Sequence, residues 1–174
     1  MKNLLVLLFV SFTLSCCNKD DNPPADPLSQ LPPATQIGAG TFGCLVNGVP
    51  YVDNSGDFNC FYQLVNGEYY FGITASINNQ ENLQIDIGSL KSQLIEGEIL
   101  LKERENGNFY AFLSFDCICP PGKTNSVQPG SLNVSKFDIQ NNIVSATFEF
   151  TVTDPNTGAV YNITNGRFDS TFTQ

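Results

Sequence analysis

The chain has 174 residues, of which 41% are hydrophobic, so it is long enough for one domain with a hydrophobic core. Its formal net charge is −9 and its pI is about 4.2, which disfavours nucleic acid and anionic phosphates as partners. It contains no histidine, the commonest general base and metal ligand, and this disfavours most classes of enzyme.

The chain begins with a short basic segment and an apolar run, residues 4–14, of signal-peptide length. This run is too short to cross a bilayer as a helix, and no other segment approaches the roughly 20 apolar residues that a crossing needs. Two cysteines, Cys16 and Cys17, follow where an ordinary secretory signal has small residues. We therefore expect residues 1–16 to be a lipoprotein signal peptide.

The segment Leu14-Ser15-Cys16-Cys17 resembles the lipobox of bacterial lipoproteins, in which the first mature residue is a cysteine that receives diacylglycerol. Cys17-Asn18-Lys19-Asp20-Asp21 is similar to the export signal of surface lipoproteins in the Bacteroidota, which favours lipidation of Cys17 over the alternative, Cys16. Two or three acyl chains, palmitate among them, anchor a protein stably. The resemblance implies an outer-membrane lipoprotein exposed on the cell surface, or alternatively on the periplasmic face.

Residues 17–40 begin with the expected lipidated cysteine and contain five prolines, with Asp, Asn, Ser and Gly between them. No apolar periodicity is present, and proline-rich segments of this kind are extended and form no core. We expect a disordered tether over residues 17–40 that holds a single domain, residues 41–174, clear of the membrane.

From Thr41 onward apolar and polar residues alternate, as is typical of half-buried β-strands. The dipeptides Asn47-Gly48, Asn66-Gly67, Asn106-Gly107 and Asn165-Gly166 predict turns. Residues 89–94 are expected to form a helical turn, and the phase change near Lys136 predicts a β-bulge. The expected strands are 42–46, 49–52, 58–64, 69–77, 83–87, 98–101, 109–115, 132–139, 144–152, 160–164 and 168–172. The predicted fold is all-β: an antiparallel β-sandwich or open barrel of roughly ten short strands. The absence of a long amphipathic helix that could cover a sheet favours the sandwich.

Both ends of this domain carry recognisable motifs. Residues 31–38 (LPPATQIG) and 41–48 (TFGCLVNG) resemble the opening of a family of uncharacterised Bacteroidota outer-membrane lipoproteins, and residues 135–138 (SKFD), 143–150 (IVSATFEF) and 163–169 (ITNGRFD) are similar to its ending. The resemblance implies a secreted β domain of unknown function. It supplies no catalytic residues.

Four cysteines lie in the domain, Cys44, Cys60, Cys117 and Cys119, and in an oxidising envelope they allow three connectivities. A bridge between Cys117 and Cys119 would close a very small loop with strained geometry, so we expect Cys44 and Cys60 each to pair with one of them. Free buried thiols and a four-cysteine zinc site are the alternatives. The Cys-x-Cys spacing and the oxidising compartment disfavour zinc.

The sequence contains no nucleophile elbow, phosphate-binding loop or metal-ligand cluster, so we expect no catalysis, no cofactor and no metal. Residues 53–57 (DNSGD) offer oxygen ligands, but they lack the length and the terminal glutamate of a calcium loop. A hydrolase built on a pair of carboxylates is the remaining, disfavoured enzymatic alternative.

The expected function is therefore a membrane-anchored, non-catalytic binding or structural module with a protein or glycan partner. The candidate contact for a protein is the long Pro/Gly-rich loop 117–130, with Cys117, Pro120, Pro121 and Lys123 as candidate contact residues. The alternative is a glycan-binding module, because Tyr70, Tyr110 and Phe112 occupy the strand phase opposite to the predicted core residues.

Overall fold

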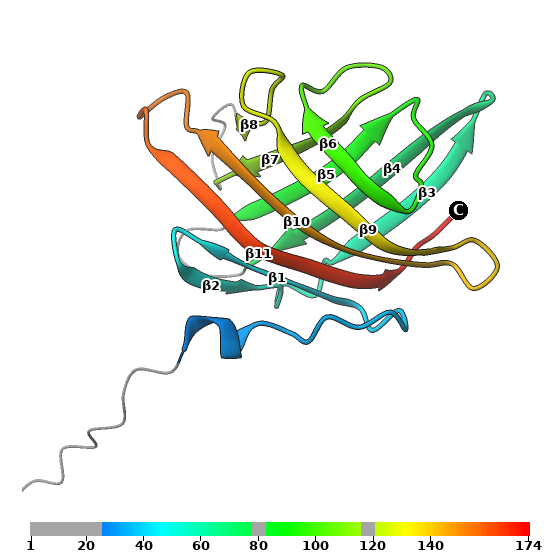
Figure 1. The fold of residues 1–174 in the computed structure, drawn as a ribbon, viewed down its shortest axis with the longest axis horizontal. Helices are drawn as coiled ribbons and strands as arrows, with labels where there is room; N and C mark the ends of the chain where they lie inside the picture. The colour runs from blue at the N-terminus through cyan, green and yellow to red at the C-terminus, as the bar shows by residue number, and fades with distance from the viewer. Residues whose placement is uncertain (1–25, 78–82, 116–120) are drawn as a thin grey trace, which may run out of the picture.

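The alternating pattern produces eleven β-strands in the computed structural model, which describes residues 26–77, 83–115 and 121–174 (Figure 1). A short 3₁₀ helix, η1 (Pro27–Gln30), precedes them. The strands are β1 (Thr41–Val46), β2 (Val49–Val52), β3 (Asn59–Val65), β4 (Glu68–Ser76), β5 (Gln84–Leu90), β6 (Gly97–Lys102), β7 (Phe109–Ser114), β8 (Gly122–Lys123), β9 (Gly130–Asp138), β10 (Ile143–Thr153) and β11 (Val160–Thr171).

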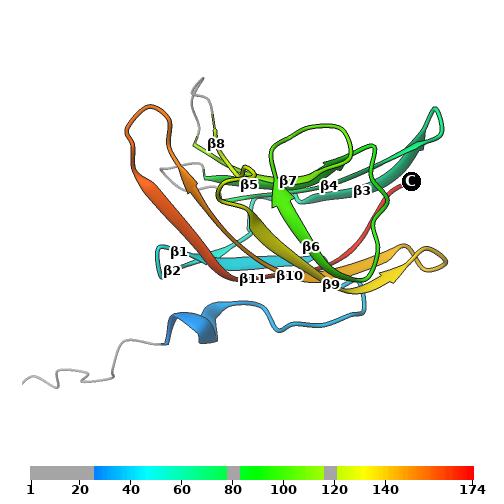
Figure 2. The same ribbon diagram turned by 45° about the horizontal axis from the view of Figure 1, so that its top comes forward.

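These strands form one curled sheet with the order β2-β1-β11-β10-β9-β6-β7-β5-β4-β3, and β8 pairs with β7. Neighbouring strands are antiparallel except β6 and β7. The sheet curls so far that β9, β10 and β11 face β3, β4, β5 and β7 across the core (Figures 1 and 2). The prediction of an all-β sandwich or open barrel is confirmed, and the curled single sheet corresponds to the barrel.

The residues that follow β11 connect it to β3, the strand at one edge of the sheet. Thr173, just beyond β11, donates its backbone N–H to the carbonyl of Cys60 at 3.0 Å, and Tyr62 donates its own to Thr173 at 2.9 Å. At the opposite edge, the hydroxyl of Tyr51 on β2 lies 2.7 Å from the carbonyl oxygen of Ala75. Both contacts narrow the opening of the barrel.

Aromatic side chains from both halves of the sheet meet in the core. The rings of Phe42 and Phe148 lie 5.1 Å apart between their centroids, and Phe71 on β4 stacks on Phe168 of β11 across the interior at 6.4 Å. All four are at most 3% exposed. Burial of one such ring stabilises the fold by about 1.5–3 kcal/mol, so this cluster fixes how the two walls pack.

Three of the four predicted Asn-Gly turns are confirmed, among them Asn106-Gly107, where Gly107 has φ of 88°. Asn47-Gly48 has φ of 50° and 81°, and Asn66-Gly67 has φ of 52° and 82°, as a type I′ hairpin turn requires at its two central residues. The predicted turn at Asn165-Gly166 is wrong, because β11 runs through it without interruption. Asn165 has φ of 53° and the register shifts opposite Phe148, so this dipeptide forms a β-bulge within a long strand.

The bulge expected near Lys136 is confirmed at the adjacent residue. Ser145 pairs with Lys136 and Ala146 with Val134, which leaves Ser135 as the extra residue. The helical turn expected over residues 89–94 is wrong: Ser89 belongs to β5 and pairs with Phe71 and Phe109, and residues 91–94 form no helical turn. Cross-strand pairing on both sides therefore outweighs the weak local preference for a turn.

Residues 26–40 form an arm that packs along the outside of the sheet beneath β1, β2 and β11 (Figure 2). Leu31 is buried, and the ring of Pro32 lies where a β-carbon on Gly43 would stand, 2.6 Å from its Cδ. Residues 26–40 are thus not the disordered tether expected of this segment, because burial and hydrogen bonds to the sheet offset the entropy lost on ordering. Within the described residues, no helix has the length and apolar character needed to span a membrane.

Candidate functional site

Four half-buried aromatic side chains lie on the outer surface of the wall formed by β3, β4, β5 and β7. They alternate with the buried core residues of the same strands, and we call this surface the aromatic face. Its rings belong to Phe61, Tyr70, Tyr110 and Phe112. Three of them were predicted to point away from the core; Phe61 was missed, although it occupies the outward phase of its strand.

A row of residues across the strands explains how the rings lie. Phe61 pairs with Gly72, Gly72 with Gly88, and Gly88 with Tyr110. A β-carbon on Gly72 would lie 2.4 Å from the Phe61 ring, and one on Gly88 would lie 2.8 Å from the Tyr110 hydroxyl oxygen. The two glycines therefore leave space that lets both rings lie over the sheet instead of standing upright from it.

The next row carries polar groups beside a third ring. Thr74 pairs with Asp86, Asp86 with Phe112, and Phe112 with Lys123 of β8. The Asp86 carboxylate accepts hydrogen bonds from the Thr74 hydroxyl at 2.6 Å and from the Gln84 amide at 2.8 Å. This arrangement places fixed hydrogen-bonding groups next to aromatic carbon.

Three cationic side chains border the same face. The guanidinium carbon of Arg104 lies 5.4 Å from the centre of the Tyr110 ring, and the Tyr110 and Phe112 rings are 4.9 Å apart. Lys102 pairs with Tyr110 across β6 and β7, and Lys123 is exposed beside Phe112. Rings, a carboxylate and cations thus lie together on one surface.

The predicted partner loop reaches this surface only in part. Cys117 and Pro120 lie outside the described residues, whereas Pro121 is half-buried and Lys123 lies in β8, on the edge of β7. The strand β8 was not predicted, because two residues are too few to show alternation. Lys123 therefore lies beside the aromatic face.

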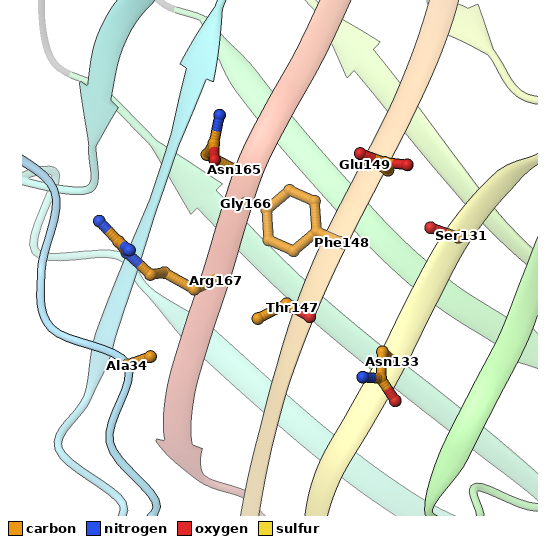
Figure 3. A pocket seen from close by; sticks show the side chains of 9 residues that line it. All are labelled: Ala34, Ser131, Asn133, Thr147, Phe148, Glu149, Asn165, Gly166 and Arg167. Carbon is orange, nitrogen blue, oxygen red and sulfur yellow. The ribbon is translucent and has the colours of Figure 1, made fainter. Parts of the chain in front are cut away.

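A concave region lies on the opposite wall, over β9, β10 and β11. This groove has a volume of about 260 Å³ and is bounded by Ala34 of the arm (Figure 3). Glu149 and Arg167 are its charged residues, and the Arg167 side chain turns away from Glu149 toward the arm, where its Nη2 donates to the carbonyl of Leu28 at 3.4 Å. With one carboxylate among its lining residues, the groove does not supply the carboxylate pair of a glycosidase.

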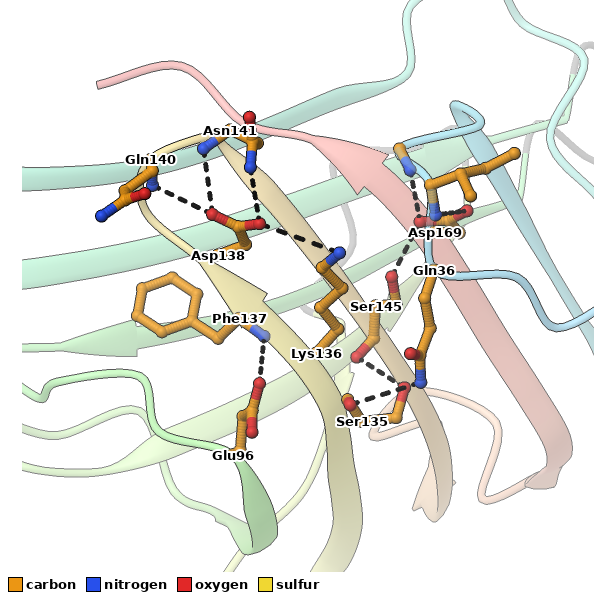
Figure 4. Close-up of polar contacts among 12 residues, drawn as sticks. Gln36, Glu96, Ser135, Lys136, Phe137, Asp138, Gln140, Asn141, Ser145 and Asp169 are labelled. Atoms are coloured by element: carbon orange, nitrogen blue, oxygen red, sulfur yellow. Dashed lines mark hydrogen bonds and ion pairs between the residues drawn. The ribbon is translucent and has the colours of Figure 1, made fainter.

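The arm is fixed to the sheet by Asp169, which is 1% exposed. Its carboxylate accepts five hydrogen bonds: from the Thr35 hydroxyl at 2.6 Å, the backbone N–H groups of Ile37, Gly38 and Ala39 at 3.0, 2.8 and 3.2 Å, and the Ser145 hydroxyl at 2.7 Å. Figure 4 shows the bond from Ser145. Burial raises the pKa of Asp169, but these donors outweigh it and lower the pKa to about 2. The residue is therefore ionised and holds the arm in place.

Cys44 and Cys60 are free thiols in the structure, so the expected bridges from them are not present. Their expected partners, Cys117 and Cys119, lie outside the described residues. Burial raises the pKa of each of the two described thiols to about 12, and their exposed fractions are 0% and 5%. A thiol that stays protonated and inaccessible is a poor nucleophile for disulfide exchange, and both side chains act here as small core residues.

The lipidation candidates Cys17 and Cys16 also lie outside the described residues. In residues 26–77, 83–115 and 121–174, no group of three or more His, Cys, Asp or Glu side chains is placed to hold a metal ion. No protein-family model, no curated protein and no solved structure matches the chain.

Proposed function

We propose that this chain is a membrane-anchored lipoprotein whose β domain is a non-catalytic module that binds a glycan on its aromatic face. The observation that carries the proposal is the row Phe61-Gly72-Gly88-Tyr110, with Phe112 and Asp86 in the next row. Aromatic rings that lie over a sheet offer flat apolar surfaces to the C–H faces of sugars, and adjacent fixed polar groups pair with sugar hydroxyls.

The arm and the aromatic face lie on different sides of the domain. The arm runs beneath β1, β2 and β11, whereas β3, β4, β5 and β7 form the opposite wall (Figure 2). An anchor at Cys17, or at Cys16, would hold the arm side toward an outer membrane and leave the aromatic face turned away from it. This orientation suits a ligand outside the cell, or in the periplasm under the alternative assignment.

The docked arm also shortens the connection to the membrane. Residues 17–40 would reach about 80 Å when fully extended, but residues 26–40 pack on the sheet and add no reach, so the nine residues 17–25 set the limit at about 30 Å. Under this proposal the domain stays close to the membrane surface. It would therefore meet polymers that lie along the membrane.

The proposal is tested with the full-length protein, purified in a detergent that has no sugar headgroup. Retardation in gels that contain neutral or acidic polysaccharides measures binding, and Phe112→Ala should reduce it about tenfold, because one stacked ring contributes roughly 1–1.5 kcal/mol. Asn133→Ala, an exposed change in the polar groove of Figure 3, is the control and should leave retardation unchanged. No retardation by any polysaccharide would refute the glycan assignment.

A protein partner, the other function expected from the sequence, is addressed by the same variants. If a partner binds the loop 117–130 instead of the aromatic face, crosslinking on intact cells should capture it equally from wild type and Phe112→Ala. Membrane attachment is tested by Cys17→Ala together with Cys16→Ala, which should release the protein from the membrane fraction.

A further inference from the structure

We infer that the ligand of the aromatic face is an acidic polysaccharide, bound through its carboxylate or sulfate groups by Lys102, Arg104 and Lys123. This inference rests on the proposed function and specifies its ligand class. It starts from the unequal distribution of cations over a chain with a net charge of −9. The described residues contain six lysines and arginines, and three of them border the aromatic face: the full set is Lys91, Lys102, Arg104, Lys123, Lys136 and Arg167.

None of the three forms an ion pair in the described part of the chain, where the pair recorded within 4 Å joins Lys136 to Asp138. The neighbouring carboxylates accept hydrogen bonds from neutral donors, and the pKa of Glu103 is lowered chiefly by the Ser126 hydroxyl and least by the charge of Lys102. Glu103 accepts the Ser126 hydroxyl at 2.6 and 2.8 Å, and Asp86 accepts from Thr74 and Gln84. The three cations therefore remain available to an anionic ligand.

The pairing of the strands sets the spacing of the three cations. Lys102 and Lys123 both lie on the same edge of β7, opposite Tyr110 and Phe112, which are two residues apart. Arg104 lies over the Tyr110 ring, and this contact directs a planar group with several donors toward the face. Successive charges along an extended polymer could thus meet successive cations while its apolar faces contact Phe112 and Phe61.

A depression beside the aromatic face offers space for further sugar units of the ligand. Lys102 also lines this depression of about 360 Å³ together with Glu98, Leu100 and Asn108, between β6 and the segments 92–95 and 107–109. An extended chain can follow the row from Phe61 to Lys102 and enter this depression. A flat lipid surface or a duplex would not follow such a path, so we favour a flexible polysaccharide.

The test compares polygalacturonate with the neutral polymer dextran, using the full-length protein in detergent. We expect binding to polygalacturonate that weakens at least tenfold between about 50 and 200 mM salt, as ion-pair contacts require. The triple variant Lys102→Gln, Arg104→Gln, Lys123→Gln should lose binding by about a hundredfold, whereas Lys136→Gln, which removes a charge from β9 in the opposite wall, should bind as wild type does.

Each other outcome has a definite meaning. Equal binding to dextran, insensitive to the triple variant and to salt, would overturn the acidic ligand and leave the glycan proposal intact. No binding to either polymer, nor to other polysaccharides, would overturn both. Equal binding to duplex DNA or to vesicles of phosphatidylglycerol would overturn a polysaccharide site in favour of general attraction to polyanions. Circular dichroism melting of each variant confirms that it is folded.

Discussion

Replacing Asp169 with asparagine should destabilise the protein and release its N-terminal arm. The pKa of this buried carboxyl is lowered from 3.8 to about 2. At about 1.4 kcal/mol for each pKa unit, the folded state gains about 2 kcal/mol from the ionised form. Asparagine removes the charge and turns an NH₂ group toward N–H and O–H donors, which costs up to about 2 kcal/mol more. The expected total loss is about 2–4 kcal/mol.

The pH dependence of this loss identifies its cause. A carboxyl whose pKa is lowered on folding stabilises the folded state above the unfolded pKa, here 3.8, and loses that contribution as the pH falls through about 2. The difference in unfolding free energy between wild type and Asp169→Asn should therefore be constant from about pH 5 to 7 and shrink between about pH 4 and 2.

Urea unfolding followed by circular dichroism gives this difference at each pH. Asp57→Asn, which removes the same charge at an exposed position, is the matched control and should change stability by less than about 0.5 kcal/mol. Hydrogen exchange adds a local measurement, because the amides of Gly38 and Ala39 should lose protection only in Asp169→Asn. A loss no larger than that of the control, or one that does not change between pH 5 and 2, would refute the reasoning.

Three further predictions concern the core. Cys44 and Cys60 should resist alkylation at pH 8 in the native state and react once unfolded, because burial raises their pKa to about 12; rapid native labelling, followed by mass spectrometry, would contradict this. Gly166→Ala should cost about 1–3 kcal/mol in thermal or urea unfolding, because its β-carbon would lie 2.3 Å from the buried Phe148 ring; an unchanged midpoint would show that the ring can move. Tyr51→Phe should cost about 1–2 kcal/mol, because two buried carbonyls lose its hydroxyl, and an unchanged unfolding free energy would mean that water replaces it.

The features predicted correctly depend on short-range rules. Alternation with a period of two marked the strands, and Asn47-Gly48 and Asn66-Gly67 marked hairpin turns because both dipeptides tolerate positive φ. The phase change near Lys136 marked the bulge at Ser135 for a similar reason, since one extra residue reverses the faces of a strand. These signals are local, so a single sequence contains them.

The same kind of signal failed where pairing with distant strands decided the outcome. Asn165-Gly166 has the composition of a hairpin turn, yet β11 continues through it because it is held between β1 and β10 along its length. The bulge there allows both ladders to keep their pairing on either side. Ser89 was similarly drawn into β5 by its two neighbours.

The candidate site shows the division most clearly. The alternation of the strands was enough to place Tyr70, Tyr110 and Phe112 on an outward face. The pairing of Gly72 with Gly88, which leaves space for two rings, depends instead on the register between strands. Likewise, no local pattern connects Lys102 and Lys123. They lie on the same edge of β7 only because β6 and β8 both pair with that edge.

By itself, then, the amino-acid sequence determined the all-β class, the strand phases and the hairpin turns, since these follow from the conformations of neighbouring residues. Only the tertiary structure decided that residues 26–40 pack on the sheet, because the carboxylate that holds them, Asp169, lies about 130 residues further along the chain. It also decided how cations and rings combine on the aromatic face. Both depend on strand order, and strand order arises from packing of the whole core.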